Sequence, residues 1–239
     1  NTFTICDVIA DVSGNASLVI AYLTDGTLTL TGTGKMINIS SYNGAPWYSM
    51  RNSISAAKVD DGITYIGSYF LNDCTNVKTF TIPSSVRSLA LNALSSPSFD
   101  VVYINSSFSD SQGKYEYRYL ANLKADTVVF GESVTSIPAY LLNDNKNVKK
   151  IIIKGSPTSI GSNICQSTGS VTHIYVVDGT TAQKITGPVA NTNIVFVIGN
   201  GATVDEGTDK SEFSAVSKDG YIATWYEYDS SIAEYSGYS

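Results

Sequence analysis

Residues 125–147 and 148–170 read ADTVVFGESVTSIPAYLLNDNKN and VKKIIIKGSPTSIGSNICQSTGS, two consecutive units that share one pattern of about 23 residues. Similar units precede and follow them: ISAAKVDDGITYIGSYFLNDCTN (54–76), VKTFTIPSSVRSLALNALSSPS (77–98), VTHIYVVDGTTAQKITGPVANTN (171–193) and the opening IVFVIG (194–199). Such periods are typical of solenoids, in which each unit buries its apolar face by stacking on its neighbours. The repeat therefore predicts an elongated solenoid, and it says more about shape than about ligand.

Apolar residues recur at the same positions of the units. In the first half of each unit they are Val77, Phe80 and Ile82; Ala125, Val128 and Phe130; Val148, Ile151 and Ile153; and Val171, Ile174 and Val176. In the second half they are Ile63, Ile66 and Phe70; Val86, Leu89 and Ala93; and Val134, Ile137 and Leu141. Side chains of a strand alternate between its two faces, so the first set predicts short parallel strands that share one core. Gly, Pro and Ser then turn the chain, and we expect each unit to be a strand, a corner and a loosely wound return.

Three stretches resemble the repeats of the BspA-like family of bacterial leucine-rich repeat surface proteins. They are DDGITYIGSYFLNDCTN (60–76), VKTFTIPSSVRSL (77–89) and SPTSIGSNI (156–164). The N-terminal DGTLTLTGTGKM (25–36) and APWYSM (45–50) look like the segment that precedes such repeats. The resemblance covers about 25–200, with a slip of register over 99–124 and a weaker match over 177–193. It implies a curved solenoid, secreted or held at the cell surface, that binds other proteins or host components and catalyses no reaction.

The chain divides into three parts by pattern. Residues 1–50 predict an N-terminal β cap, in which Asp25-Gly26 forms a turn and Trp47 and Tyr48 seal the open end of the first repeat. Residues 51–199 are the leucine-rich solenoid. Residues 200–220 are polar and rich in turn residues, which predicts a linker or polar cover, and 221–239 are crowded with aromatic residues. We expect the last segment to be a strand pair or the start of another module, in a native chain that continues beyond Ser239.

Composition excludes several classes of partner. A net charge of −6 and a pI of about 4.7 disfavour nucleic acid, which binds to basic patches, and anionic membrane surfaces. Apolar runs such as SLVIAYL (17–23) are too short to span a bilayer. Charged residues make up 15% of the chain, so its solubility depends on hydroxyl and amide groups, as in a β-rich exterior.

The sequence predicts no catalytic, cofactor-binding or metal-binding residues. Ser55-Ala-Ala-Lys58 matches the Ser-x-x-Lys motif of penicillin-recognising enzymes, but it lies on a repeat strand and lacks the partner motifs. The single histidine, His173, is expected on the surface of a strand. The cysteines Cys6, Cys74 and Cys165 have no metal-ligand spacing, and Cys74 falls where the resembling family places Cys. Cys74 and Cys165 are therefore expected to be small buried thiols.

The outward residue of each strand provides the candidate binding surface. Along the stack these residues are Lys58, Thr81, Tyr103, Val129, Ile152, Tyr175 and Ile198. Most are apolar or aromatic, whereas a solvated sheet face is normally polar. Tyr103, Val129, Ile152 and Tyr175 are accordingly the candidate partner-binding residues. Two alternatives stay open: these residue types suit any strand, or the C-terminal aromatics Tyr221, Trp225, Tyr226 and Tyr228 cover the stripe.

Two classes of function remain. The first is a non-enzymatic module, secreted or at the cell surface, that adheres to a protein, glycan or host component through the sheet face of the solenoid. Abundant tyrosine favours this, because Tyr supplies rigid amphipathic contact area. The second is a structural spacer that displays a downstream domain. An enzyme ranks third, since the sequence places no nucleophile beside a base.

Overall fold

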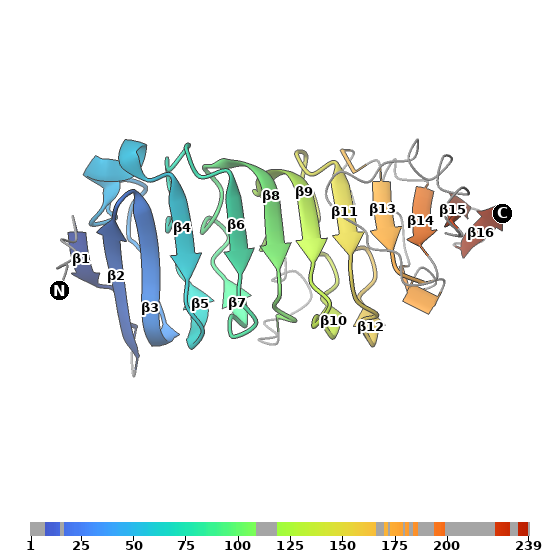
Figure 1. The fold of residues 1–239 in the computed structure, drawn as a ribbon, viewed down its shortest axis with the longest axis horizontal. Helices are drawn as coiled ribbons and strands as arrows, with labels where there is room; N and C mark the ends of the chain where they lie inside the picture. The colour runs from blue at the N-terminus through green and yellow to red at the C-terminus, as the bar shows by residue number, and fades with distance from the viewer. Residues whose placement is uncertain are drawn as a thin grey trace.

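The computed structural model is a β-solenoid whose strands stand side by side along one long axis (Figure 1). It describes residues 8–14, 17–108, 119–165, 170–171, 173–178, 180–181, 184–185, 194–198, 223–229 and 234–238. The described part is almost entirely strand, turn and loop, and it includes one short 3-10 helix, η1 (Tyr48–Ser53). The mainly β fold class predicted from the repeat is confirmed.

Three antiparallel strands begin the described chain: β1 (Val8–Asp11), β2 (Leu18–Thr24) and β3 (Thr27–Lys35). Asp25 and Gly26 connect β2 to β3 with φ values of 49° and 74°, as a two-residue hairpin turn requires. This turn was predicted from the Asp-Gly pair. β3 then passes from antiparallel to parallel pairing, because β4 (Ala56–Val59) runs in its direction.

The large sheet is a parallel ladder with one strand from each coil. Its strands are β6 (Thr79–Ile82), β8 (Ser98–Ile104), β9 (Lys124–Phe130), β11 (Lys150–Ile153), β13 (His173–Val176) and β14 (Ile194–Ile198). Each pairs in parallel with the next, so that Val102, Val128, Ile151 and Ile174 stand in one row. β15 (Ala223–Asp229) and β16 (Glu234–Tyr238) extend the sheet with antiparallel pairing. The predicted parallel ladder is confirmed.

A second, shorter ladder runs along the return segments. β5 (Ile63–Ile66) pairs with β3 and with β7 (Ser88–Leu89), and β10 (Ser136–Ile137) pairs with β12 (Ser159–Ile160). The expectation of a loosely wound return was incomplete, because the returns of successive coils are close enough to exchange backbone hydrogen bonds. No pairing joins β7 to β10 in the described chain, so this second ladder is interrupted.

The interior between the two ladders is one continuous apolar cluster from Val12 to Ile185. The inward residues predicted from the repeat all lie in it, at most 2% exposed: Phe80, Ile82, Val128, Ile151, Ile153, Ile174 and Val176. Trp47 closes the start of this interior at 1% exposure, with its ring edge-on to Phe70. Its indole N–H donates to the Phe70 carbonyl oxygen at 3.1 Å. The predicted contact of Trp47 with the first repeat is confirmed.

Candidate functional site

One row of side chains crosses the outer face of the N-terminal sheet and continues over the large sheet, on the face turned away from the interior. We call it the outer row: Tyr22, Thr29, Lys58, Thr81, Tyr103, Val129, Ile152 and Tyr175. Registered strand pairs link its members, except between Lys58 and Thr81, where β4 contacts β6 and the residues correspond by repeat position. The row continues to Phe196, which pairs with Tyr175. Ile198 was the residue expected there, and this register assignment was wrong.

Thr29 near the start of the outer row is 4% exposed, and from Lys58 onward exposure falls along the row. Lys58 and Thr81 are exposed and Tyr103 is half-buried. Val129 is 1% exposed, and Ile152 and Tyr175 are 0% exposed, so the expectation that they form an open contact surface is wrong. These three are not part of the interior cluster, because their neighbours along each strand point inward in their place. Their burial in an isolated chain means that the chain itself covers the outer face over β9, β11 and β13.

The C-terminal aromatic residues are the cover that the sequence suggested for this face. Trp225, Tyr226 and Tyr228, named as a possible cover from the sequence, lie on β15, and Tyr221 lies outside the described residues. The covering role of the C-terminal aromatics therefore stays a prediction. Of the four candidate partner-binding residues, Tyr103 alone retains exposed surface.

The open part of the outer row is Lys58, Thr81 and Tyr103. The ammonium of Lys58 forms an ion pair with Asp60 at 2.7 Å, and the hydrogen bond in this pair raises the pKa of Lys58 and lowers that of Asp60. Both groups therefore stay charged at neutral pH. The surface that results is mixed, with a cation, a hydroxyl and a phenol in line.

A second feature lies where the short ladder is interrupted, in the coil that slips out of register in the sequence. β8 keeps its place in the large sheet, but the coil that it opens is longer than its neighbours and has no return strand in its described residues. Serine hydroxyls replace the missing backbone partners. Ser106 Oγ donates to the Val86 carbonyl oxygen, and Ser107 Oγ accepts from the Thr135 N–H at 2.9 Å.

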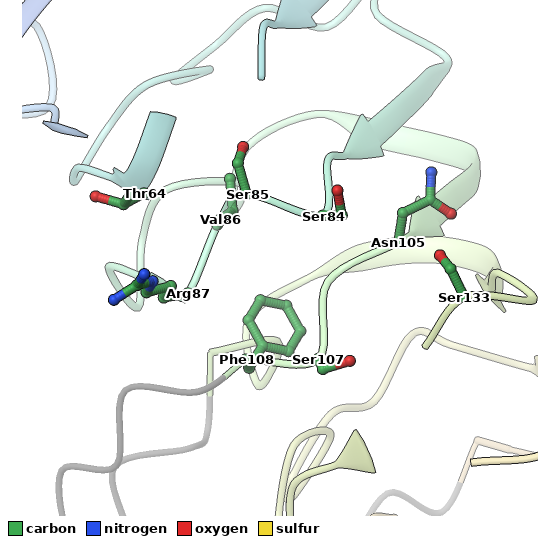
Figure 2. Close-up of a pocket in the computed structure, with 9 residues that line it drawn as sticks. All are labelled: Thr64, Ser84, Ser85, Val86, Arg87, Asn105, Ser107, Phe108 and Ser133. Carbon is green, nitrogen blue, oxygen red and sulfur yellow. The ribbon is translucent and has the colours of Figure 1, made fainter. Parts of the chain in front are cut away.

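A pocket of about 420 Å³ opens beside this interruption. Its lining residues are Thr64, Ser84, Ser85, Val86, Arg87, Asn105, Ser107, Phe108 and Ser133. Figure 2 shows Thr64 and Arg87 at one end, Ser84, Asn105 and Ser133 at the other, and the Phe108 ring between them. The polar residues of the second end follow the carboxyl ends of β6, β8 and β9. With Thr64 included, the pocket is thus built by four successive coils.

Arg87 is the residue that distinguishes this pocket from the rest of the solenoid. It occupies the unit position that holds Thr64, Thr135 and Thr158 in the other coils, and its N–H donates to the Thr64 carbonyl just as Thr158 donates to Thr135. Its exposed guanidinium has no hydrogen-bond or ion-pair partner among the described residues. Arg87 was not among the predicted site residues, although its signal is present in the sequence as a charged residue at a position that otherwise holds Thr.

The two described thiols are buried. Cys74 and Cys165 form no disulfide, and burial raises the pKa of Cys74 to about 12 and raises the pKa of Cys165 as well. Cys6 lies outside the described residues, and His173 is on β13. Among the described residues no three His, Cys, Asp or Glu side chains gather closely enough to hold a metal ion. In the same part of the chain, no helix is long and apolar enough to cross a membrane.

The stacked coils with two parallel ladders define a leucine-rich repeat solenoid. Comparison with family models identifies the type: residues 107–185 match the BspA type leucine rich repeat region, in six copies. Residues 107–185 therefore carry leucine-rich repeats of the BspA type, as the resemblance predicted. The units before residue 107 lie outside the matched range.

A solved structure of a leucine-rich repeat protein from Eubacterium ventriosum is similar to this chain, with 25% sequence identity and a TM-score of 0.49. The similarity covers 74% of this chain and 45% of the other, so the chain spans less than half of that protein's length. The search of curated proteins gave no match.

Proposed function

We propose that this chain is a non-enzymatic module, secreted or held at the cell surface, that binds a protein partner through the open part of the outer row. Leucine-rich repeat domains typically bind proteins, and proteins with BspA type repeats are typically bacterial surface or secreted proteins. The observation that carries the proposal is the accessible line of Lys58, Thr81 and Tyr103 on a rigid parallel sheet. Tyr103 supplies amphipathic contact area, and Lys58 and Thr81 supply hydrogen-bond donors beside it.

Site-specific cross-linking tests this proposal. A benzophenone amino acid would replace Thr81, which is exposed at the centre of the open part, or Leu91, which is 50% exposed beyond the short β7 and serves as the control. Each variant would be illuminated with purified extracellular proteins, one at a time. A partner that cross-links at Thr81, does not cross-link at Leu91, and binds less tightly to Tyr103→Ala supports the proposal. Equal cross-linking at both positions, or binding unchanged by Tyr103→Ala, contradicts it.

A further inference from the structure

We infer that the pocket between β6, β8 and β9 is a binding site for an acidic oligosaccharide, with a uronic acid carboxylate at Arg87 and sugar hydroxyls at Ser84, Asn105 and Ser133. The site is separate from the outer row and would act independently of it. It requires no reaction, since recognition is by hydrogen bonds and charge.

The pocket results from a specific departure from the repeat. In regular coils the return segment of one coil donates to that of the preceding coil, as Thr158 does to Thr135 and Arg87 to Thr64. In the coil that follows β8, Ser106 and Ser107 satisfy these backbone groups through their hydroxyls, and the Phe108 N–H donates to Ser106 Oγ at 2.9 Å. The backbone polar groups beside the opening therefore keep hydrogen-bond partners. A cavity maintained in this way is a stable part of the structure.

Polar groups that the fold does not use line the pocket. The side chains of Ser84, Asn105 and Ser133, together with the guanidinium of Arg87, form no hydrogen bonds with other described residues. Ser85 Oγ is buried and also has no partner in the described part of the chain. Nearly all buried polar atoms in folded proteins find a partner, so an unpartnered wall atom is a sign of a ligand. Gly131 leaves room here, since a Cβ at this position would collide with Asn105 Oδ1.

The charge of the pocket selects an anion. The protein carries a net charge of −6, yet none of the described lining residues is acidic, and Arg87 is the cation among these described residues. Glu132 is adjacent to Ser133 in sequence but is not among the lining residues. A guanidinium with no internal partner has its planar fork of donors available for a carboxylate, which it can bind in bidentate fashion. A negatively charged group is therefore favoured at the Arg87 end.

The remaining lining indicates a sugar rather than an acidic peptide. Hydroxyl and amide side chains can each donate and accept, which matches the vicinal hydroxyls of a saccharide. Val86 and Phe108 lie between the two polar ends (Figure 2), and at 1% and 4% exposure they form a buried apolar floor beneath the polar groups. The ring of Phe108 is held in place by Tyr119 at a centroid distance of 5.6 Å. An acidic peptide would satisfy Arg87 but would leave the hydroxyls at the other end without partners.

Titration calorimetry of the whole chain tests the inference with four probes. They are tetragalacturonate, its methyl ester, maltotetraose and a tetraglutamate peptide. Tetragalacturonate is expected to bind, its methyl ester to bind at least about tenfold more weakly, and the other two to bind more weakly still. Arg87→Thr, which installs the residue of the other coils, is expected to remove the preference for the acid over the ester. Asn105→Ala is expected to weaken the binding of tetragalacturonate and of its methyl ester roughly tenfold. The thermal midpoint should not shift, because this side chain forms no hydrogen bond with another described residue.

Lys146→Thr is the matched control, since it removes one exposed positive charge away from the pocket. Binding that is lost in Arg87→Thr and kept in Lys146→Thr supports the site. Three results would overturn it: no binding of tetragalacturonate to the parent at millimolar ligand, equal loss in Arg87→Thr and Lys146→Thr, or tighter binding of tetraglutamate than of the sugar. Tyr103→Ala should leave sugar binding unchanged, so failure of this site and failure of the protein-binding proposal are distinguishable.

Discussion

At the scale of single residues, the corner of each coil shows how one position can be stabilised in different ways. Cys74 and Asn145 occupy equivalent positions in their units, and both are fully buried. Asn145 donates to the carbonyl oxygens of Leu120 and Leu123 and accepts from the N–H groups of Asn147 and Val148, at 2.7 to 2.9 Å. Its side chain thus joins two coils and satisfies four backbone groups. The thiol of Cys74 fills the same place mainly as a small apolar group.

Replacing Asn145 by Leu should therefore be strongly destabilising. The change removes four hydrogen bonds and leaves the N–H groups of Asn147 and Val148 without their acceptor, whereas the carbonyl oxygens of Leu120 and Leu123 each keep another donor. We expect the free energy of unfolding to fall by about 3 kcal/mol. Urea unfolding followed by circular dichroism measures it. The control is Asn76→Leu, an exposed Asn whose side chain donates to one carbonyl, that of Asn52, and there the loss should stay below about 1 kcal/mol. Equal losses in the two variants would show that the bonds of Asn145 contribute little.

The buried thiols predict a pH dependence. Burial disfavours the thiolate, which raises the pKa of Cys74 from 9.0 to about 12 and also raises that of Cys165. In a Cys6→Ser protein, a disulfide reagent at pH 8 should detect no thiols in the folded state and both after unfolding. Since the unfolded chain ionises first, these thiols should lower stability as the pH rises above 9, and Cys74→Ala should reduce that part of the slope. Rapid labelling of the folded protein would contradict this account.

At the scale of elements, the repeat predicted the large sheet correctly because apolar residues such as Val128 and Phe130 mark one face of a strand with period two. The same alternation assigned Val129 to the opposite face but could not report what lies over that face. The return strands β10 and β12 were missed, since two-residue strands carry no periodicity. The interruption beside Ser106 and Ser107 was visible as a slip in register, but its consequence, a pocket, depends on how four coils meet in space.

The cap is an element whose removal has a clear expected result. β3 pairs with both β4 and β5, and Trp47 covers Phe70, so a chain that begins at residue 54 would expose the interior of the first coil. Exposed apolar surface of this kind favours aggregation. We expect this shortened chain to melt at a lower temperature and to form oligomers in light scattering. A single Trp47→Ala change should destabilise in the same direction by about 3 to 5 kcal/mol. A shortened chain as soluble and as stable as the parent would refute the sealing role.

At the scale of the whole molecule, the outer face of the sheet changes character from one end to the other. From Lys58 onward its exposed members Lys58 and Thr81 are polar, and its buried members Val129, Ile152 and Tyr175 are apolar or aromatic, whereas Thr29 before them is polar and buried. Composition therefore follows burial, as expected if the second half of the face is a permanent internal contact. The sequence contained this gradient, but an apolar stripe on a strand face is equally consistent with a partner surface. Burial distinguishes an internal contact from a partner surface. It leaves the open part of the row, Lys58, Thr81 and Tyr103, accessible to a partner.

A carboxylate introduced at a buried or at an exposed position of the outer row should have different effects on stability. Ile152→Glu places a carboxylate where exposure is 0%, so it should lower the free energy of unfolding by about 3 kcal/mol or more, or raise the pKa of the new carboxyl until it is neutral. Thr81→Glu places the same group at an exposed position, and it should change stability by no more than about 0.5 kcal/mol while weakening any partner that uses the open part. Thermal melting at pH 7 and pH 4 measures both variants. The Ile152→Glu protein should recover part of its stability at the lower pH, because protonation removes the buried charge. Two variants that melt alike at both pH values would mean that the second half of the face is open in solution, and the binding surface would then extend across the whole row.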